Sequence, residues 1–366
     1  MGLTGIKSGV IDESKMHFLS FNRKAAATAL LIAALSLGAC APQASDHQAR
    51  FFVFGTVVDV SIWSADEDAA DEAFSELETL FRDLHRDLHA WEPGLLTEIN
   101  RAFAEGRTVR ADPGIVELLQ RSQEIEAATG GRFNPAIGGL IELWGFHTSD
   151  FPVEGPPPDS ESIQKWVRQH PSSLDIHIDG LDLSSANPAV QLDFGGIAKG
   201  YAIDLACEAL RKLGLENAIV NAGGDLRTMG QHGDRAWRIA IRDPRGGIVG
   251  SLESRGSEAI FTSGNYERFR EDQEIRYPHI LDPRSGWPVR ELSSVTVITA
   301  EGWLADAAAT ALIVAGSKDW AAVASALGLK QVLLVDEGGT VYVTPAMRGR
   351  VKLKDGLEVV VAEPVN

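Results

Sequence analysis

The 366-residue chain has only two cysteines, Cys40 and Cys207, and is poor in basic residues, with 34 lysines and arginines against 51 aspartates and glutamates. The resulting net charge of −17 argues against nucleic-acid binding, because nothing in the sequence resembles a basic stripe for a phosphate backbone. The sequence also lacks a His/Cys cluster for zinc, a G-x-S-x-G elbow, a G-x-G-x-x-G fingerprint and a Walker loop. Hydrophobic residues make up 44% of the chain, so a large buried core is expected.

The first forty residues have the pattern of a targeting signal. Arg23 and Lys24 precede an apolar run, 25–39, which is shorter than the ~20 residues of a transmembrane helix and is typical of a bacterial secretory signal. The run ends in "LGAC", a lipoprotein-type cleavage site, so we expect residues 1–39 to be removed and Cys40 to be lipidated. This predicts a protein anchored by lipid to the periplasmic side of a bacterial membrane. The alternative is a soluble secreted protein in which Cys40 stands by chance.

After removal of the signal, Cys207 is the only thiol within the mature chain, so no internal disulfide is possible. Cys207 lies in an apolar helical pattern, "AIDLACEALRKLG", which indicates a core residue and not a nucleophile. Residues 40–50 are polar and are expected to form a flexible linker. Residues 51–366 are then expected to form the folded domain.

Helical and strand periodicities are mixed along that domain. The expected helices are residues 66–89, 112–130 and 302–316; the expected strands are residues 51–63, 217–230, 237–244 and 293–300, with a hairpin over residues 172–194. Asp112 is the expected N-cap of the second helix, and Gly130 its end. Because strands arrive in hairpins as well as around helices, the pattern favours an α+β fold with mixed or antiparallel sheets flanked by helices.

The stretch "VQLDFGGIAKGYAID", residues 190–204, places a carboxylate and a lysine on either side of a glycine pair. Asp193 at a strand end can accept hydrogen bonds from a ring imide or a ribose, and the glycines allow close approach of backbone to a ligand. Lys199 near a helix start can hold a phosphate as a point charge. The alternative is a surface turn with a solvated Asp–Lys pair.

Three further segments carry candidate binding groups. In "GGRFNPAIGGLIELWGF", Phe133 can provide a stacking wall, although much of this segment is expected to be core. In "IFTSGNYERF", residues 260–269, backbone amides and hydroxyls can bind an anion. In "YPHILDPRSGWPV", His279 and Asp282 share one proline-punctuated loop and can serve as a general base, His279 first and Asp282 next. A structural histidine is the alternative there.

The segment "LADAAATAL" carries Asp306 and Thr310, which are four residues apart and therefore on one side of a helix. A carboxylate and a hydroxyl, with a free backbone carbonyl nearby, suit a hard cation such as Mg²⁺. An aspartate early in a helix and a threonine in its middle are also ordinary structural choices, so this spacing alone leaves both interpretations open.

Taken in order, these blocks resemble the ApbE family, the periplasmic FAD:protein FMN transferases. The resemblance extends from "FGT" at residues 54–56 to "SVTVITAEGWLADAAATAL" at residues 294–312, and its strongest elements are "LDFGGIAKGYAID", "NAGGD", "TSGNYER", "HILDPRSGWPV" and "ADAAAT". It implies an ApbE-like α+β fold that holds FAD in a cleft between subdomains, together with Mg²⁺.

The resemblance also implies roles for individual residues. The positions that it assigns to FAD binding are Phe54, Trp91, Arg132, Phe133, Asn134, Asp193, Lys199 and Leu281. It assigns the metal to the side chains of Asp306 and Thr310 and to the backbone carbonyls of Gly196 and Ala309. The chain departs from the family pattern where it has Asn134 for the usual aspartate, Gly196 for alanine and Ala309 where some members have an acid.

The reaction implied is the transfer of FMN from FAD to a threonine or serine hydroxyl of an acceptor flavoprotein, with release of AMP. Two alternatives use the same residues. A metal-dependent FAD pyrophosphatase would give free FMN and AMP, and a non-catalytic FAD-binding lipoprotein would release no AMP. The expected acceptor is a membrane redox subunit or another extracytoplasmic flavoprotein with a short Ser/Thr motif.

Overall fold

A computed structural model describes residues 43–363, and from Ser45 onwards these residues form one compact unit. The expected signal peptide, residues 1–39, and the lipidation site Cys40 lie outside the described residues, so both stay predictions. Within residues 43–363, no helix is both long enough and apolar enough to cross a membrane.

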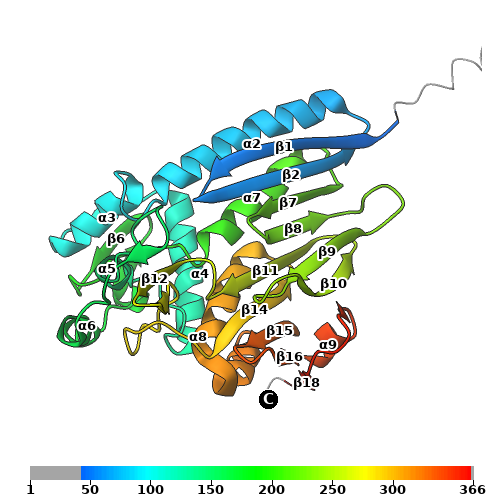
Figure 1. Ribbon diagram of the computed structural model, residues 1–366. Coiled ribbons are helices and arrows are strands. Elements are labelled where there is room, and N and C mark those ends of the chain that lie inside the picture. The colour runs from blue at the N-terminus through cyan, green and yellow to red at the C-terminus, as the bar shows by residue number, and fades with distance from the viewer. Residues whose placement is uncertain (1–42, 364–366) are drawn as a thin grey trace, which may run out of the picture. The chain divides into compact units, whose positions relative to one another are not determined.

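A nine-stranded sheet runs through this unit (Figure 1). Its strands, in spatial order, are β1 (Ser45–Val53), β2 (Thr56–Ser64), β7 (Ala218–Ala222), β8 (Asp225–Met229), β11 (Glu258–Gly264), β14 (Leu292–Thr299), β15 (Gln331–Asp336), β16 (Val341–Val343) and β18 (Val359–Val361). Every neighbouring pair is antiparallel except β16 and β18, which are parallel. The sheet is therefore mostly antiparallel, as the hairpin-rich sequence predicts.

Three smaller sheets surround the large one. They comprise β17 (Lys352–Leu353), β10 (Ile248–Ser254) and β9 (Trp237–Arg242); β13 (Ile275–Pro278), β12 (Phe269–Asp272) and β4 (Val153–Glu154); and β3 (Val109–Arg110), β6 (Asp182–Ser185) and β5 (Ile176–Asp179). The hairpin expected over residues 172–194 is confirmed, because β5 and β6 pair antiparallel around the turn at Gly180.

Helices cover one face of the large sheet. The helices of the described residues are α2 (Glu67–Asp87), α3 (Leu95–Ala104), α4 (Pro113–Thr129), α5 (Gly138–Leu143), α6 (Ser160–Val167), the 3₁₀ turn η1 (Ser173–Asp175), α7 (Ala198–Lys212), α8 (Gly302–Ala326) and α9 (Pro345–Arg348). In Figure 1, α2 runs along β1 and β2, whereas α7 and α8 lie behind the middle strands.

Strand β11 explains how both faces of the sheet are buried. Side chains alternate along a strand, so Ala259 and Phe261 pack with α2 and α7, whereas Ile260 packs with Trp237 and Val249 of β9 and β10 on the other face. The central strands are consequently apolar on both sides. The α+β class and the flanking helices predicted from the sequence are confirmed.

The expected linker over residues 40–50 is wrong from Ser45 onwards, because these residues form β1 and pair with β2 along the whole strand. The single strand expected over residues 51–63 is a hairpin, which turns at Phe54 and Gly55 with φ of 56° and 65°. Polar side chains alternate with half-buried ones along β1, since this strand lies at the edge of the sheet. Composition alone does not distinguish such an edge strand from a linker.

The helix boundaries follow the capping residues in the sequence. Asp112 caps α4 by accepting a hydrogen bond from Gly114 N over 2.8 Å, and Gly130 ends that helix in the left-handed conformation, as predicted. The helix expected over residues 302–316 continues to Ala326 beyond a break at Gly316, where the backbone is not helical. Residues 217–230 form the hairpin β7–β8 instead of one strand, turning at Gly223 and Gly224.

Candidate functional site

A buried cluster of charged side chains lies where α7, α8 and β8 begin. Lys199 in the first turn of α7 forms an ion pair with Asp225, the first residue of β8. Oδ1 of Asp225 accepts a hydrogen bond from the backbone N–H of Thr262 on β11 over 2.9 Å, which fixes the carboxylate. Burial lowers the pKa of Lys199, but the charges of Asp225 and Asp306 outweigh burial and raise it above its ordinary value. Lys199 is therefore a permanent cation.

Asp306 of α8 joins this cluster through a close contact between two helices. A Cβ on Gly200 would lie only 2.2 Å from the carbonyl oxygen of Gly302, so α7 and α8 approach to a distance that only glycine permits. At this contact the N–H of Gly200 donates to Oδ2 of Asp306 over 3.0 Å. Burial raises the pKa of Asp306 to about 6, against the opposing effect of the Lys199 charge.

A second carboxylate, Asp204 of α7, stabilises the same contact between α7 and α8. Oδ1 and Oδ2 of Asp204 accept hydrogen bonds from the backbone N–H groups of Gly302 and Trp303, over 2.8 and 3.0 Å, at the start of α8. Arg227 of β8 pairs with Asp204, and both side chains are largely buried. Asp204 thus satisfies the exposed amides of a helix N-terminus, and it holds Lys199 and Asp306 on neighbouring helices in register.

Oxygen donors gather beside Asp306. Thr310 lies one turn further along α8, and its Oγ1 is 3.4 Å from Oγ of Ser263 at the end of β11. A Cβ on Gly196 would lie 3.3 Å from Oγ1 of Thr310, so Gly196 lies directly beside this hydroxyl, and Ala309 is buried next to it. The structure brings the four predicted metal residues together; the direction of the Gly196 and Ala309 carbonyls stays a prediction.

This donor set suits Mg²⁺ better than a softer metal. Within residues 43–363 no group of three or more His, Cys, Asp or Glu side chains forms a metal site, and the donors near Asp306 are a carboxylate and hydroxyls. Mg²⁺ prefers oxygen ligands and is commonly held by one or two carboxylates together with substrate phosphates. Only Oδ2 of Asp306 accepts a hydrogen bond from a described residue, which leaves Oδ1 for a cation.

His279 lies close to the charged cluster, in the loop after β13. Its Nδ1 is 3.1 Å from the carbonyl oxygen of Arg268. A carbonyl only accepts hydrogen bonds, so Nδ1 carries the proton and Nε2 keeps its lone pair. Burial, reinforced by the nearby charges of Arg268 and Lys199, lowers the pKa of His279 to about 4. The imidazole is therefore neutral at pH 7, with Nε2 unprotonated.

Arg268 adds a second cation near Lys199 and His279. Its Nη2 donates to the carbonyl oxygen of Gly55, in the β1–β2 turn, over 3.3 Å. No carboxylate among the described residues pairs with its guanidinium. A cation with no acidic partner, beside a lysine in a sheltered loop, is suited to bind an anionic ligand.

Asp282, the second choice for a base, has a different local role. Both of its carboxylate oxygens accept hydrogen bonds from the guanidinium of Arg284, over 2.9 and 2.8 Å, and Oδ1 also accepts from Arg284 N. Its backbone pairs with Trp287 and Gly286 across the same turn. Both carboxylate oxygens of Asp282 are thus engaged by Arg284, so the geometry favours His279 over Asp282 as the base.

Two of the predicted FAD-binding residues, Phe54 and Trp91, belong to a row of aromatic rings. Phe54 contacts His85 of α2 edge to face at 5.9 Å between ring centroids, and His85 contacts His89 at 5.1 Å. Trp91 contacts His89 at 4.3 Å, and its other neighbour is His147. The row ends at Asp193, whose Oδ2 accepts a hydrogen bond from Nε2 of His147 over 3.2 Å.

The remaining predicted FAD-binding residues lie nearby but are engaged within the protein. Phe133 is buried, and its ring lies 3.4 Å from the position of a Cβ on Gly196. The Asn134 side chain bonds to the backbone of Pro171 and Ala136, and Arg132 pairs with Asp319 of α8. Leu281 is buried against the cluster of Trp144 and Trp166. Direct ligand contacts of these side chains stay a prediction.

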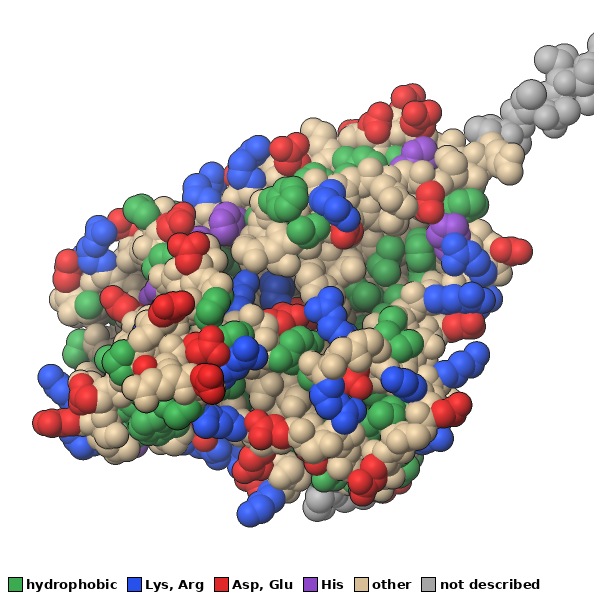
Figure 2. Space-filling model, in the orientation of Figure 1, with side chains coloured by type: hydrophobic (Ala, Val, Ile, Leu, Met, Phe, Trp, Pro, Cys, Tyr) green, Lys and Arg blue, Asp and Glu red, His purple; other side chains and the backbone are tan. Residues whose placement is uncertain are grey.

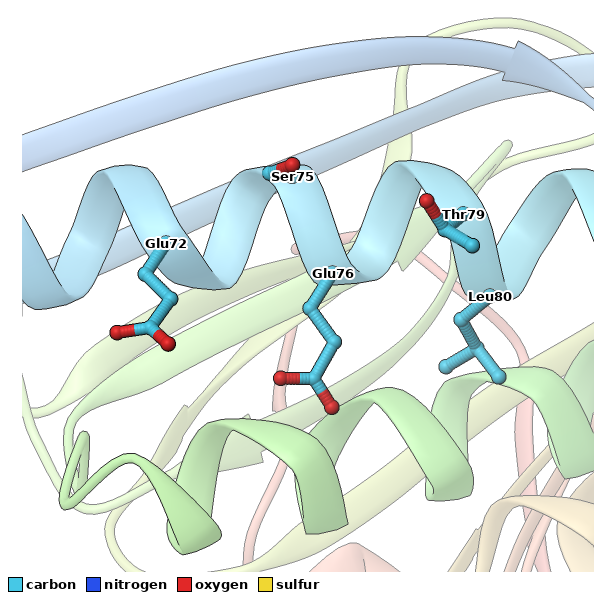
Figure 3. A pocket seen from close by; sticks show the side chains of 5 residues that line it. All are labelled: Glu72, Ser75, Glu76, Thr79 and Leu80. Carbon is cyan, nitrogen blue, oxygen red and sulfur yellow. The ribbon is translucent and has the colours of Figure 1, made fainter.

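A pocket of about 460 Å³ opens beside the aromatic row, lined among others by Trp91, His147, Trp166 and Gln191. On the face seen in Figure 2 the surface is hollowed near the middle, and basic and acidic side chains lie within the hollow. A second pocket, of about 600 Å³, lies along α2, where Glu72, Glu76 and Leu80 point toward α7 (Figure 3). None of the predicted site residues lines this second pocket.

Three residues of the site were missed by the sequence reasoning: Asp225, Arg268 and His147. Asp225 belongs to "NAGGD" and Arg268 to "TSGNYER", so the motifs that hold them were recognised without a role for these two side chains. His147 follows the apolar run "LIELWGF" and has no sequence signal of its own. Only the fold brings it to Asp193, which is 46 residues away.

The chain is similar to proteins that transfer flavin. The sequence profile of the ApbE family matches residues 54–333. A FAD:protein FMN transferase of Rhodobacter capsulatus is 42% identical over 349 residues, which cover 95% of this chain and 66% of the relative. One of Haemophilus influenzae is 26% identical over 316 residues, which cover 82% of this chain and 90% of the relative. This chain thus spans just under two thirds of the first relative and most of the second.

Solved structures agree with these sequence relatives. The crystal structure of the ApbE protein of Thermotoga maritima matches with a TM-score of 0.76 at 30% identity, over 83% of this chain and 98% of that one. The flavin transferase ApbE of Vibrio cholerae matches with a TM-score of 0.73 at 26% identity, over 84% and 99%. Nearly the whole of each solved chain thus has its counterpart in this chain.

Proposed function

Because the chain belongs to the ApbE family, we propose that it is a FAD:protein FMN transferase, which moves FMN from FAD to a Thr or Ser hydroxyl of an acceptor flavoprotein. The observation that carries this proposal is the convergence of three chemistries: cations at Lys199 and Arg268, oxygen donors at Asp306 and Thr310, and a neutral imidazole at His279. Enzymes that catalyse phosphoryl-type transfer commonly use all three.

The bond changes are simple. The acceptor hydroxyl oxygen bonds to the FMN-side phosphorus of the FAD pyrophosphate, and the bond from this phosphorus to the bridging oxygen breaks. AMP leaves with that oxygen, and FMN remains attached to the acceptor through a phosphoester. The hydroxyl proton passes to Nε2 of His279, since Nδ1 already donates to the Arg268 carbonyl.

Negative charge accumulates on the pyrophosphate oxygens as AMP leaves. Fixed cations of this chain would stabilise that charge. The carboxylates of Asp225 and Asp306 raise the pKa of Lys199 and so keep it protonated, and Arg268 lies beside it. We assign both to binding the pyrophosphate. Their positions are set by backbone and side-chain contacts before substrate arrives, so little reorganisation is needed during reaction.

Asp306 and Thr310 are proposed to hold Mg²⁺ by their side chains, with Gly196 and Ala309 supplying backbone carbonyls. When bound, Mg²⁺ supplies Lewis-acid stabilisation of the charge on the pyrophosphate oxygens. The buried position of Asp306 limits access by water, which strengthens its attraction for a cation.

The flavin end of FAD is assigned to the aromatic row and Asp193. Trp91 keeps 41% of its surface exposed, which leaves aromatic surface for a flat ring. Phe54 lies at the opposite end of the row, in the β1–β2 turn that also contacts Arg268. The flavin and pyrophosphate sites are therefore linked by one short segment of backbone.

The cellular setting is proposed from the N-terminal sequence. Cleavage before Cys40 and lipidation of its thiol would anchor the protein to the periplasmic side of a bacterial membrane, next to a membrane redox subunit or another extracytoplasmic acceptor. The mass of the mature N-terminal peptide tests this directly: we expect a diacylglycerol on Cys40. A mature chain that starts elsewhere, or an unmodified Cys40, contradicts the proposal.

One incubation tests the reaction itself. The protein is mixed with FAD, Mg²⁺ and an acceptor that bears the Thr motif, and we expect covalently yellow acceptor and one AMP for each flavin attached. An acceptor with that threonine changed to valine is the matched control and should stay colourless. Free FMN with AMP and no yellow acceptor would instead identify a pyrophosphatase, and FAD bound without AMP release would identify a binding protein.

A further inference from the structure

His147 connects two of the residues assigned to the flavin. Its imidazole stacks on the indole of Trp91, with 5.0 Å between ring centroids and 18° between ring planes. The same ring bonds through Nε2 to Oδ2 of Asp193 over 3.2 Å. No other described side chain makes contacts of this kind to both Trp91 and Asp193.

Trp91 needs such a support because of its position. It lies in the loop between α2 and α3 and keeps 41% of its surface exposed, so the loop backbone alone leaves its side chain free to change rotamer. His89 holds one edge of the indole, whereas the parallel stack on His147 fixes the plane of the ring. Stacking of this kind contributes beyond the area it buries.

The same imidazole also holds Asp193, by the hydrogen bond from its Nε2. Oδ1 of Asp193 accepts the N–H of Gly195 over 2.8 Å, and its backbone N–H donates to the carbonyl of Pro135. The bond from His147 fixes the second oxygen, so the carboxylate cannot rotate. Both Asp193 and His147 keep less than a tenth of their side-chain surface exposed, which strengthens this bond.

His147 itself is held firmly. It follows Trp144 and Phe146, whose rings stack at 6.2 Å and are buried in a core with Leu140 and Trp166. The imidazole is therefore presented by an anchored segment and not by a mobile loop. This rigidity is what a positioning residue requires.

We infer that His147 is a positioning residue, which sets the plane of Trp91 and the direction of the Asp193 carboxylate for the flavin ring of FAD. This inference rests on the proposed function, since it assumes that FAD is the ligand. Trp91 would stack on the ring while Asp193 accepts a hydrogen bond from the ring imide. His147 itself is not required to touch the substrate.

Three variants separate the two contacts of His147. His147→Phe keeps an aromatic ring for stacking but loses the hydrogen bond, His147→Gln keeps a donor but loses the stack, and His147→Ala loses both. FAD binding is titrated with the full chain in EDTA and without acceptor, so that no transfer takes place. Two readouts are followed: the dissociation constant, and the quenching of flavin fluorescence, which reports stacking of the flavin on an aromatic ring.

We expect His147→Ala to raise the dissociation constant of FAD at least tenfold, and the Phe and Gln variants to recover part of that loss. Quenching should remain near the parent level in His147→Phe and fall in the Gln and Ala variants, and the same fall is expected for Trp91→Leu. A dissociation constant within twofold of the parent in His147→Ala, or undiminished quenching in that variant, overturns the inference.

The chain supplies a matched control at His232. This histidine also contacts a tryptophan, Trp63, at 4.4 Å between centroids, and its Nε2 lies 3.0 Å from Oδ2 of Asp46, but none of these residues belongs to the site. His232→Ala should leave FAD binding unchanged; an equal loss there would mean that His147 acts only through stability. If the parent chain binds FAD neither in EDTA nor with Mg²⁺, the proposed function fails together with this inference, whereas normal binding that is insensitive to His147 overturns the inference alone.

Discussion

The backbone N–H of Gly200 donates to Oδ2 of Asp306 over 3.0 Å and so joins the first turn of α7 to α8. This hydrogen bond exists only because the two helices meet at Gly200 and Gly302 with no side chain between them. Lys199, which precedes Gly200, and Asp306, which accepts the Gly200 N–H, are thereby brought into one charged cluster. The geometry of the candidate site therefore depends on helix packing at a pair of glycines.

Gly200→Ala tests this dependence. Its Cβ would lie 2.2 Å from the carbonyl oxygen of Gly302, so the helices must move apart, and we expect the free energy of unfolding to fall by about 1–3 kcal/mol. Urea unfolding measures the change. Gly349→Ala is the matched control, because its φ is −70° and its Cβ would meet nothing closer than 3.6 Å. Equal stability of the two variants would contradict the packing argument.

Asp306→Ala is expected to remove Mg²⁺-dependent transfer while the protein stays folded. The substitution deletes the carboxylate among the proposed metal ligands, and we expect the rate to fall by about 100-fold or more, in line with the loss of a preorganised electrostatic group. Flavinylation of the acceptor is followed across a Mg²⁺ titration, with circular dichroism to verify folding. Transfer by Asp306→Ala at the rate of the parent would show that the metal assignment is wrong.

The low pKa of His279 makes stability depend on pH. The pKa is about 4 in the folded protein and 6.5 in the unfolded chain, so between these values the unfolded chain binds a proton that the folded protein does not. The free energy of unfolding should therefore be highest above pH 6.5 and decrease as the pH falls toward 4. Urea unfolding at several pH values measures this slope. His279→Gln, which cannot titrate, should give a flatter profile, and an unchanged slope would contradict the assignment.

Cys207 is expected to be chemically silent in the native protein. It is fully buried in α7, and burial raises the pKa of its thiol to about 12, so almost no thiolate is present at pH 8. Iodoacetamide treatment followed by peptide mass analysis should find the Cys207 peptide unmodified in the native protein and alkylated in guanidinium. Rapid alkylation without denaturant would show that α7 opens readily.

The sequence predicted those parts of the fold that depend on local signals. The cap residues Asp112 and Gly130 mark both ends of α4, and the amphipathic pattern after Asp66 gives α2. The strand at Ser45 was missed because an edge strand buries little of its surface, so its sequence resembles a polar linker. The helix was predicted to end at Gly316, where the backbone is indeed not helical, but its continuation to Ala326 was not predicted.

By itself, the sequence determined the fold class and the family, and it predicted most residues of the candidate site, because ordered motifs and short-range periodicity are written along the chain. It did not determine which of those side chains meet. The pairing of Lys199 with Asp225, the approach of Arg268 to His279, and the bond from His147 to Asp193 join segments that are 11 to 46 residues apart. Such contacts depend on helix packing and strand order, which only the tertiary structure decided. Asp282, although close in sequence to His279, is instead paired with Arg284, its neighbour in the same turn.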